Sequence, residues 1–94
     1  MRANLLDRGA ARYPDWRVRM AAARALGRIG SQRDLGLLLA LLDDESWWVR
    51  YHAAQAIASL PGLSAAQLAD LRDRARTAAA DGMLAQVLAE KARP

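Results

Sequence analysis

The chain has 94 residues, which allows one small domain, and it is basic, with a formal net charge of +4. Apolar residues make up 53% of it, too many for a disordered segment, and the absence of cysteine excludes disulfide bridges, thiolate metal ligands and cysteine nucleophiles. Ala and Leu dominate the apolar residues and Phe is absent, so the composition predicts an all-α protein.

The first predicted element is a short helix over residues 4–12, which ends before Pro14 because proline pushes the preceding residue out of the α region. Asp15 is expected to cap a second helix over residues 16–29, since its side chain can accept from the free amides of the first turn. Gly30 ends this helix. Its apolar face recurs at helical spacing and consists of Val18, Ala22, Ala25, Leu26 and Ile29.

The third predicted helix covers residues 32–42 and begins after Ser31 as its cap. Its leucines are nearly continuous, so we expect it to be covered on more than one side. The acidic turn 43–45 follows, and Ser46 is expected to cap a fourth helix over residues 47–60. The apolar face of the fourth helix consists of Val49, Ala53, Ala56, Ile57 and Leu60.

Pro61 and Gly62 stop the fourth helix, and Ser64 is expected to cap a fifth helix that continues to about Ala75. A sixth helix is expected after Thr77, with its start uncertain by about four residues. Six helices make three antiparallel hairpins in a single domain over residues 1–94, divided approximately as 2–30, 31–61 and 62–94.

Two stretches, DWRVRMAAARALGRIG from Asp15 and SWWVRYHAAQAIASLPG from Ser46, repeat one pattern 31 residues apart. A fixed period of this size is typical of stacked helical hairpins, which bury a continuous core only by packing side by side. Small residues at 21–23 and 53–54 are expected to let neighbouring helices approach closely. The matching positions are Trp16 and Trp47, Val18 and Val49, Arg19 and Arg50, Ala22 and Ala53, Ala25 and Ala56, and Leu26 and Ile57.

Arg19 and Arg50 are flanked by core positions, so we expect both to lie in the grooves between hairpins. From there they could reach turn carboxylates such as Asp44, or exposed carbonyl groups. With the two cap positions Asp15 and Ser46, these residues are predicted to be structural positions of the repeat.

The pattern D-x-x-V-R-x-x-A-x-x-A-L-G-x-I-G, present as DWRVRMAAARALGRIG, closely resembles the HEAT-like repeat of bacterial phycobilisome lyase-type proteins. The connecting stretch SQRDLGLLLALLDDESWWVR also fits, and the resemblance is strong over residues 15–61. It implies an armadillo-like α-solenoid, a right-handed α-α superhelix that binds other proteins along its concave face. It carries no catalytic motif.

Residues that could carry chemistry are few. His52 is the single histidine, and the acidic turn 43–45 lacks the alternating ligand pattern of a calcium loop. No strand is predicted, so the sequence has no glycine-rich phosphate loop of the kind that follows a strand. We therefore expect no enzyme activity, no metal and no cofactor.

Four of the five aromatic residues lie near the starts of the second and fourth helices. On a helical wheel Trp47 and Tyr51 point away from the core face, so they are expected to be exposed. Exposed Trp, Tyr, Met and Arg are typical of interface hot spots. The alternative is that the Trp rings pack on the turn of the neighbouring repeat. The predicted partner-binding strip consists of Trp16, Arg17, Met20, Arg24, Trp47, Trp48, Tyr51 and Gln55, beside a track of small residues, Ala23, Gly27, Ala54 and Ala58, that would admit a helix or an extended peptide.

Three functions stay open. The first is a protein-interaction or scaffold module, with a homodimer as its nearest rival. The second is a nucleic-acid binder, because alkylpurine DNA glycosylases have HEAT-like solenoids, although three repeats are too few to wrap a duplex and Asp15 is explained as a cap. The third, a lyase-like or chaperone role on a tetrapyrrole-bearing partner, is implied by the resemblance alone.

The longest apolar run, residues 35–42, is too short to span a bilayer, so a cytoplasmic protein is expected, with a larger or membrane-anchored parent chain left open.

Overall fold

The computed structural model describes residues 8–60, 62–73 and 77–92 of the chain. Within these ranges the structure is helical and contains no strand, so the all-α prediction is confirmed. The elements are η1 (Arg8–Arg12), α1 (Trp16–Ile29), η2 (Gln32–Asp34), α2 (Leu35–Leu41), α3 (Trp47–Ser59), α4 (Ala65–Asp73) and α5 (Ala78–Ala92), where η marks a 3-10 turn.

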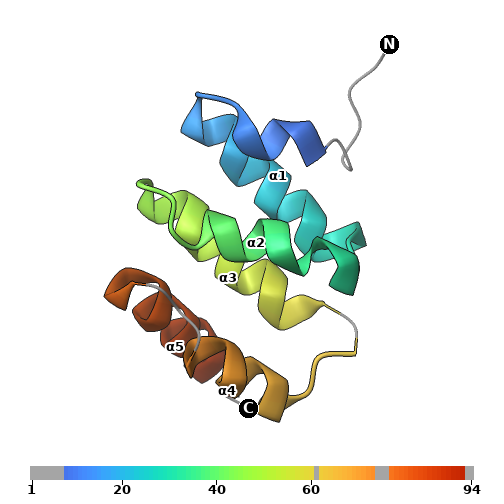
Figure 1. Ribbon diagram of the computed structural model, residues 1–94, viewed down its shortest axis with the longest axis vertical. Helices are drawn as coiled ribbons and strands as arrows, with labels where there is room; N and C mark the ends of the chain where they lie inside the picture. Colours follow the sequence, from blue (N-terminus) through green and yellow to red (C-terminus); the bar gives the residue numbers. More distant parts are fainter. Residues whose placement is uncertain (1–7, 61, 74–76, 93–94) are drawn as a thin grey trace.

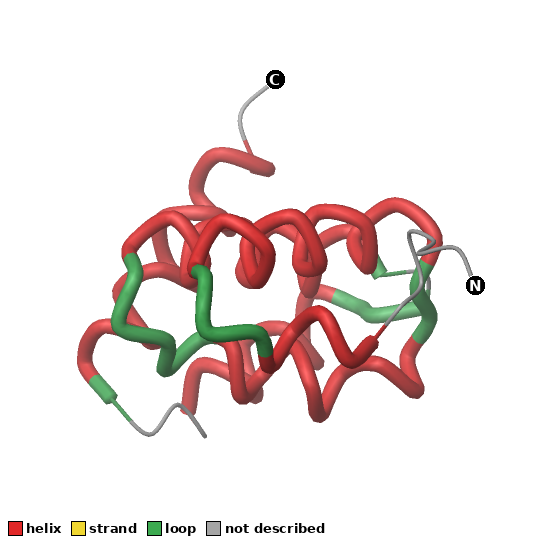
Figure 2. Tube along the Cα trace, turned by 90° about the horizontal axis from the view of Figure 1, so that it is seen from above, coloured by secondary structure: helices red, strands yellow, loops and turns green. Residues whose placement is uncertain are grey.

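The helices stack in chain order along the longest axis of the molecule, with α1 at one end and α5 at the other (Figure 1). α1 packs against α3 and α3 packs against α5, so these three helices form one layer, which we call the long-helix layer. η1, α2 and α4 contact α1, α3 and α5 respectively from the second layer. Figure 2, viewed along the stack, shows the two layers. The arrangement is a short α-solenoid.

α1 begins and ends where the repeat pattern places it. The Asp15 carboxylate accepts from the Arg17 amide at 2.9 Å and so caps the helix. Of the predicted apolar face, Ala22, Ala25 and Leu26 are buried, whereas Ile29 is 46% exposed and was wrongly assigned to the core. It is the last residue of α1, where the chain turns away.

Gly30 follows α1 in an extended conformation, with φ −81°, so a left-handed cap is not the reason for glycine here. The reason is crowding. A Cβ at this position would meet the Leu26 carbonyl oxygen and lie 2.9 Å from Asp34 Oδ2.

The predicted first and third helices are shorter than expected. The described part of the first begins at Arg8 and is a 3-10 turn, and residues 4–7 lie outside the described residues. The third begins with the turn η2, in which the Ser31 amide donates to Asp34 Oδ2 at 2.9 Å and the Asp34 amide donates to the Ser31 carbonyl. These bonds hold residues 31–34 in a 3-10 turn, so the α-helix begins only at Leu35.

α3 is the central helix, and neighbours cover three of its sides: α1 and α5 within the layer and α2 from the other layer. The predicted apolar face is confirmed, since all of its residues are buried. Ala54 and Ala58 are also buried, as is Ala23 on α1, so the predicted track of small residues presents little surface of its own. These residues serve close helix packing instead: a Cβ on Gly27 would lie only 2.9 Å from Ala56 Cα.

The third hairpin departs from the pattern as terminal repeats do. Ser64 and Gln67 exchange two hydrogen bonds at the start of α4, a capping box with distances of 2.8 and 3.1 Å. Thr77 caps α5 by accepting from the Ala80 amide at 3.0 Å. Asp81, at the repeat position of Arg50, pairs with Arg72 of α4 at 3.1 Å.

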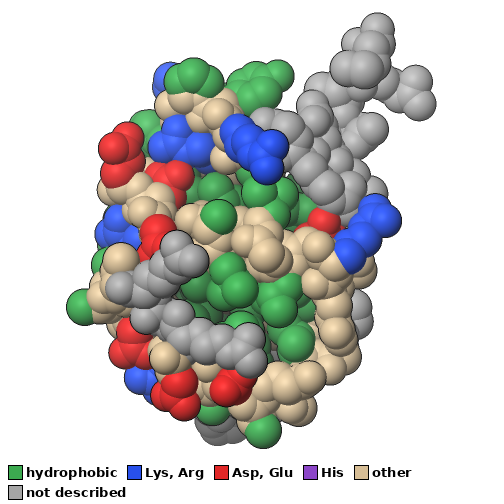
Figure 3. Space-filling view, viewed as in Figure 1, with side chains coloured by type: hydrophobic (Ala, Val, Ile, Leu, Met, Phe, Trp, Pro, Cys, Tyr) green, Lys and Arg blue, Asp and Glu red, His purple; other side chains and the backbone are tan. Residues whose placement is uncertain are grey.

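The outer side of the second layer faces the viewer in Figures 1 and 3. Apolar side chains gather in the middle of this face, and charged side chains of both signs surround them (Figure 3). Leu35, Leu37 and Leu39 of α2 are only partly buried against the core. No single sign of charge dominates this side.

Candidate functional site

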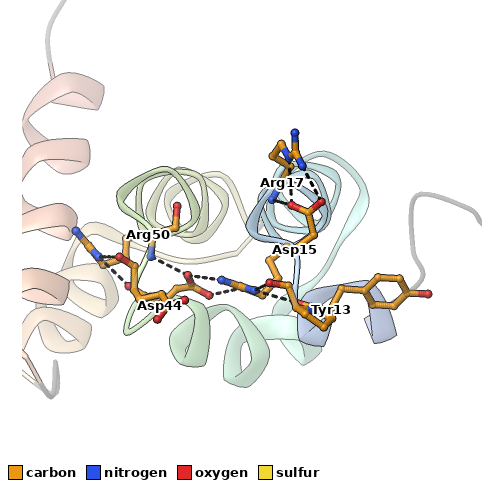
Figure 4. A network of polar contacts seen from close by, with 9 residues as sticks. Tyr13, Asp15, Arg17, Asp44 and Arg50 are labelled. Carbon is orange, nitrogen blue, oxygen red and sulfur yellow. Dashed lines mark hydrogen bonds and ion pairs between the residues drawn. The ribbon is translucent and has the colours of Figure 1, made fainter.

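The turns before α1 and α3 are joined by an ion pair. Arg19 Nε and Nη2 donate to the two oxygens of Asp44 at 2.7 and 3.1 Å, and Arg19 Nη1 donates to the carbonyls of Tyr13 and Pro14. The two charged side chains are only 12% and 10% exposed. Figure 4 shows this network, with Asp44 between the Tyr13 turn and Arg50. Arg19 thus ties the first hairpin to the second.

Asp44 also accepts from the Ser46 amide at 2.9 Å. Ser46 makes no cap hydrogen bond with its side chain, so the sequence-based assignment of that hydroxyl as a cap is wrong, because the aspartate satisfies the turn instead. Burial acts to raise the pKa of Asp44, but hydrogen bonds from Arg19 and Ser46, with the charges of Arg19 and Arg50, bring that pKa below its ordinary value.

Arg50 repeats half of the Arg19 arrangement. Its Nη1 donates to the carbonyls of Asp44 and Glu45 at 2.8 and 3.1 Å, the positions 31 residues after Tyr13 and Pro14. Its Nε is buried without a hydrogen-bond partner among the described residues. The residue 31 positions after Asp44 is Ala75, which has no carboxylate. The repeat has therefore lost the acid that would complete the pair.

An aromatic cluster lies at the start of α3, and we define it as Trp47, Trp48, Tyr51 and His52. Trp47 stacks on Tyr51 with ring centroids 5.0 Å apart and meets Trp48 edge-on at 4.9 Å, while Trp48 stacks on His52 at 6.4 Å. Trp47 remains 42% exposed and Trp48 51%. The rings hold one another in place and still present apolar surface to solvent.

Tyr51 faces α5 and is half-buried. Its hydroxyl donates to Glu90 Oε1 at 3.3 Å and accepts from Gln55 Nε2 at 2.8 Å. Burial and the nearby Glu90 carboxylate raise the pKa of Tyr51. On α1, Trp16 is 39% exposed, whereas Met20 is partly buried against the core. Tyr51 and Met20 are therefore less exposed than their sequence pattern predicts.

A groove lies between α1 and α3 on the outer side of the long-helix layer, with a volume of about 340 Å³. Arg24 and Arg28 of α1 stand on one side of it. Its other side is α3, and its lining residues are Ala23, Arg24, Gly27, Arg28, His52, Gln55, Ala56 and Ser59. A second hollow of about 460 Å³ lies between α3 and α5, and its lining residues are Gln55, Ala58, Ser59, Val87 and Glu90. Gln55 and Ser59 border both, so the two hollows meet across α3.

Trp48, His52, Gln55 and Ser59 form the open side of α3. Their spacing of four, three and four residues is one helical stripe, and the helical wheel places all four on one side of the helix. His52 and Ser59 were left out of the predicted strip because that strip was chosen for Trp, Tyr, Met and Arg side chains. The expected strip was centred on Trp47 and Tyr51, and of these Tyr51 turns toward α5, where its hydroxyl donates to Glu90.

The charges of the groove are uneven. Arg17 pairs with Asp15 at 3.2 Å, but Arg24 and Arg28 are exposed and have no ion pair with any acidic side chain in the described ranges. Burial, with the positive charge of Arg24, lowers the pKa of His52 and so keeps its ring neutral near pH 7. The groove therefore offers two cations and several neutral polar groups.

Two other kinds of feature were considered for the described helices, a metal site and a membrane-spanning segment. They hold no group of three or more His, Asp or Glu side chains that could bind a metal ion. None of them is both long enough and apolar enough to cross a membrane. The arrangement on the long-helix layer is thus one that can recognise a partner through aromatic rings, arginines and polar groups.

Comparison with known proteins agrees with this architecture. The chain matches the family model of HEAT repeats over residues 5–90. No curated protein and no solved structure matches it. The match is to HEAT repeats in general, so the likeness to the phycobilisome lyase-type subgroup rests on the quoted motif alone. HEAT repeats commonly mediate protein–protein interaction and are generally non-enzymatic scaffolds. With 31-residue hairpins in two layers and a family match over nearly its whole length, the chain belongs to the HEAT-repeat family.

Proposed function

We propose that this chain is a non-enzymatic interaction module that binds a protein partner on the outer side of its long-helix layer, which we call the long-helix face. The observation that carries the proposal is the aromatic cluster, in which two neighbouring Trp rings remain 42% and 51% exposed. Adjacent exposed aromatic rings beside arginines are typical of interface hot spots.

Trp48 is the central anchor of this surface. It lies on the open stripe of α3, and its neighbour on that stripe, His52, lines the groove. Its ring is held between Trp47 and His52. A side chain that is already ordered loses little conformational entropy on binding, so more of its contact energy contributes to affinity.

The flanking residues supply specificity. Trp16, Arg17 and Arg24 extend the contact surface along α1, and Gln55 offers an amide at the point where the two hollows meet. Met20 and Tyr51 support the surface from below, since both are partly buried.

The test compares Trp48→Ala with Tyr13→Ala, because Tyr13 is equally exposed, at 51%, and lies outside the aromatic cluster. A partner captured with the wild-type domain is purified, and its affinity for each variant is measured by calorimetry. We expect Trp48→Ala to weaken binding by about 2 kcal/mol or more and Tyr13→Ala to leave it unchanged. Equal affinities of the two variants, with both folded by circular dichroism, would contradict the proposal.

Two rival uses of the same face give different results. Self-association would appear as a concentration-dependent dimer in sedimentation that Trp48→Ala dissociates. Nucleic-acid binding would fall steeply with the logarithm of salt concentration, whereas an interface anchored on aromatic rings changes little.

A further inference from the structure

Arg24 and Arg28 lie one turn apart on α1 and border a groove. Other arginines near the long-helix layer are engaged: Arg19 with Asp44 and Arg17 with Asp15. Exposed arginines elsewhere on the chain, such as Arg12 and Arg33, do not line this groove. Arg24 and Arg28 are exposed and form no ion pair in the described ranges, so their guanidinium groups can bind a ligand that enters the groove from solvent.

The groove suits a narrow ligand that carries carboxylates. Ala23, Gly27 and Ala56 form part of its lining and add little bulk, because small side chains bring α1 and α3 close together there. Guanidinium groups bind carboxylates through paired, charge-assisted hydrogen bonds. Gln55 and Ser59 on the opposite side can bond backbone amides and carbonyls of an extended segment.

The charge changes sign across the face. The α1 side carries Arg24 and Arg28, the α3 stripe is neutral, and the α5 side carries Glu90 at the far hollow. A peptide can change its charge along its length and match this gradient. A nucleic-acid strand cannot, because every phosphate is negative and the strand would meet the Glu90 carboxylate.

We propose that the partner of this face is an acidic peptide segment that lies across α3, with its carboxylates on Arg24 and Arg28 and its other end, apolar or basic, in the hollow beside Glu90. This inference rests on the proposed function and specifies the partner's chemistry and direction. Trp48, next to the groove on the same helical stripe, would contact an apolar residue close to the acidic ones.

The probe is a library of random twelve-residue peptides displayed on phage and selected on the immobilised wild-type domain. We expect the enriched sequences to place Asp or Glu near an aromatic or aliphatic residue. One enriched peptide is then synthesised with its acids intact and with Asn and Gln in their place. We expect the amide form to bind at least tenfold more weakly, as read from the fluorescence of the Trp residues.

Protein variants test the same point. Arg24→Gln combined with Arg28→Gln should weaken the acidic peptide at least tenfold. The matched control, Arg12→Gln combined with Arg33→Gln, removes the same charge outside the groove and should bind as the wild type does. A spin label at the acidic end of the peptide should broaden the amide signals of α1 more than those of α5.

The outcomes separate this inference from the proposed function. Three results would overturn the acidic-segment proposal: selected peptides without acidic residues, equal affinity of the amide form, or greater broadening at α5. Weaker peptide binding by Trp48→Ala would still support a protein-binding face in each of these cases. Indifference to Trp48→Ala would instead overturn the proposed function. Failure to select any peptide, or tighter and steeply salt-dependent binding of a single-stranded DNA 20-mer, would count against both.

Discussion

Mutating the ion pair between Arg19 and Asp44 tests most directly how the first two hairpins are held together. Asp44→Ala removes a carboxylate that accepts two hydrogen bonds from Arg19 and one from the Ser46 amide. The Arg19 guanidinium would then keep only its two carbonyl partners in a site where its side chain is 12% exposed.

The cost follows from these contacts. Breaking a fully buried ion pair by removing one partner costs about 3–5 kcal/mol, and the remaining carbonyl contacts reduce this to roughly 2–4 kcal/mol here. In a domain of this size such a loss lowers the melting temperature by at least about 10 °C.

The assay is urea and thermal unfolding followed by circular dichroism, with Glu45→Ala as control, since Glu45 is exposed in the same turn. The control should stay within about 0.5 kcal/mol of the wild type. A double-mutant cycle with Arg19→Ala should give a coupling energy above about 1 kcal/mol. A coupling near zero would refute the reasoning that this pair joins the two hairpins.

The same pair makes stability depend on pH. Because the folded pKa of Asp44 lies below its unfolded value, the pair stabilises the fold fully above the unfolded value, and this contribution is lost as pH falls through the folded pKa. The difference in stability between the wild type and Asp44→Ala should therefore shrink in acid. A constant difference down to strongly acidic pH would show that Asp44 acts through packing alone.

Three further predictions concern stability. Position 75 lies outside the described residues, but by the 31-residue register it corresponds to Asp44, so Ala75→Asp should raise stability by about 1 kcal/mol by adding a carboxylate for the buried Arg50 Nε; an unchanged melting temperature would argue against this register. Ala53→Leu should cost about 1–3 kcal/mol in urea unfolding because Ala53 is fully buried between helices, and a neutral result would mean that the core can expand. Since burial and Arg24 lower the pKa of His52, the unfolded state takes up a proton first as pH falls below about 6.5. Wild-type stability should therefore decrease over that range more than that of His52→Gln, and parallel pH profiles would show that His52 does not contribute.

Much of the fold could be predicted from the sequence because the repeat encodes it twice. The bounds of α1 followed from Asp15 and Gly30, and the buried face of α3 followed from its helical spacing. The burial of Ala54 and Ala58 could not be read from one helix, because it depends on α5 lying beside α3 in the same layer. A helical wheel treats a helix as if it had one neighbour.

The candidate site was predicted in part for the same reason. Trp47 and Trp48 are exposed aromatic residues in the expected place. Neither of them lines the groove, but Trp48 stacks on His52, which does. This relation depends on how α1 packs against α3, which one helix alone does not show. The sequence named Asp44 as a carboxylate within reach of both Arg19 and Arg50, and the structure shows that the Asp44 side chain pairs with Arg19. The sequence also holds Ala75 at the position 31 residues after Asp44, so no carboxylate stands there for Arg50.

Nuclear magnetic resonance can map the binding surface of the domain directly. A selected acidic peptide is titrated into the labelled domain, and amide shifts are followed residue by residue. We expect the largest changes on the stripe of α3 from Trp48 to Ser59 and on Arg24 and Arg28 of α1. Largest changes on α2 and α4 would contradict this expectation and would place binding on the opposite side of the molecule.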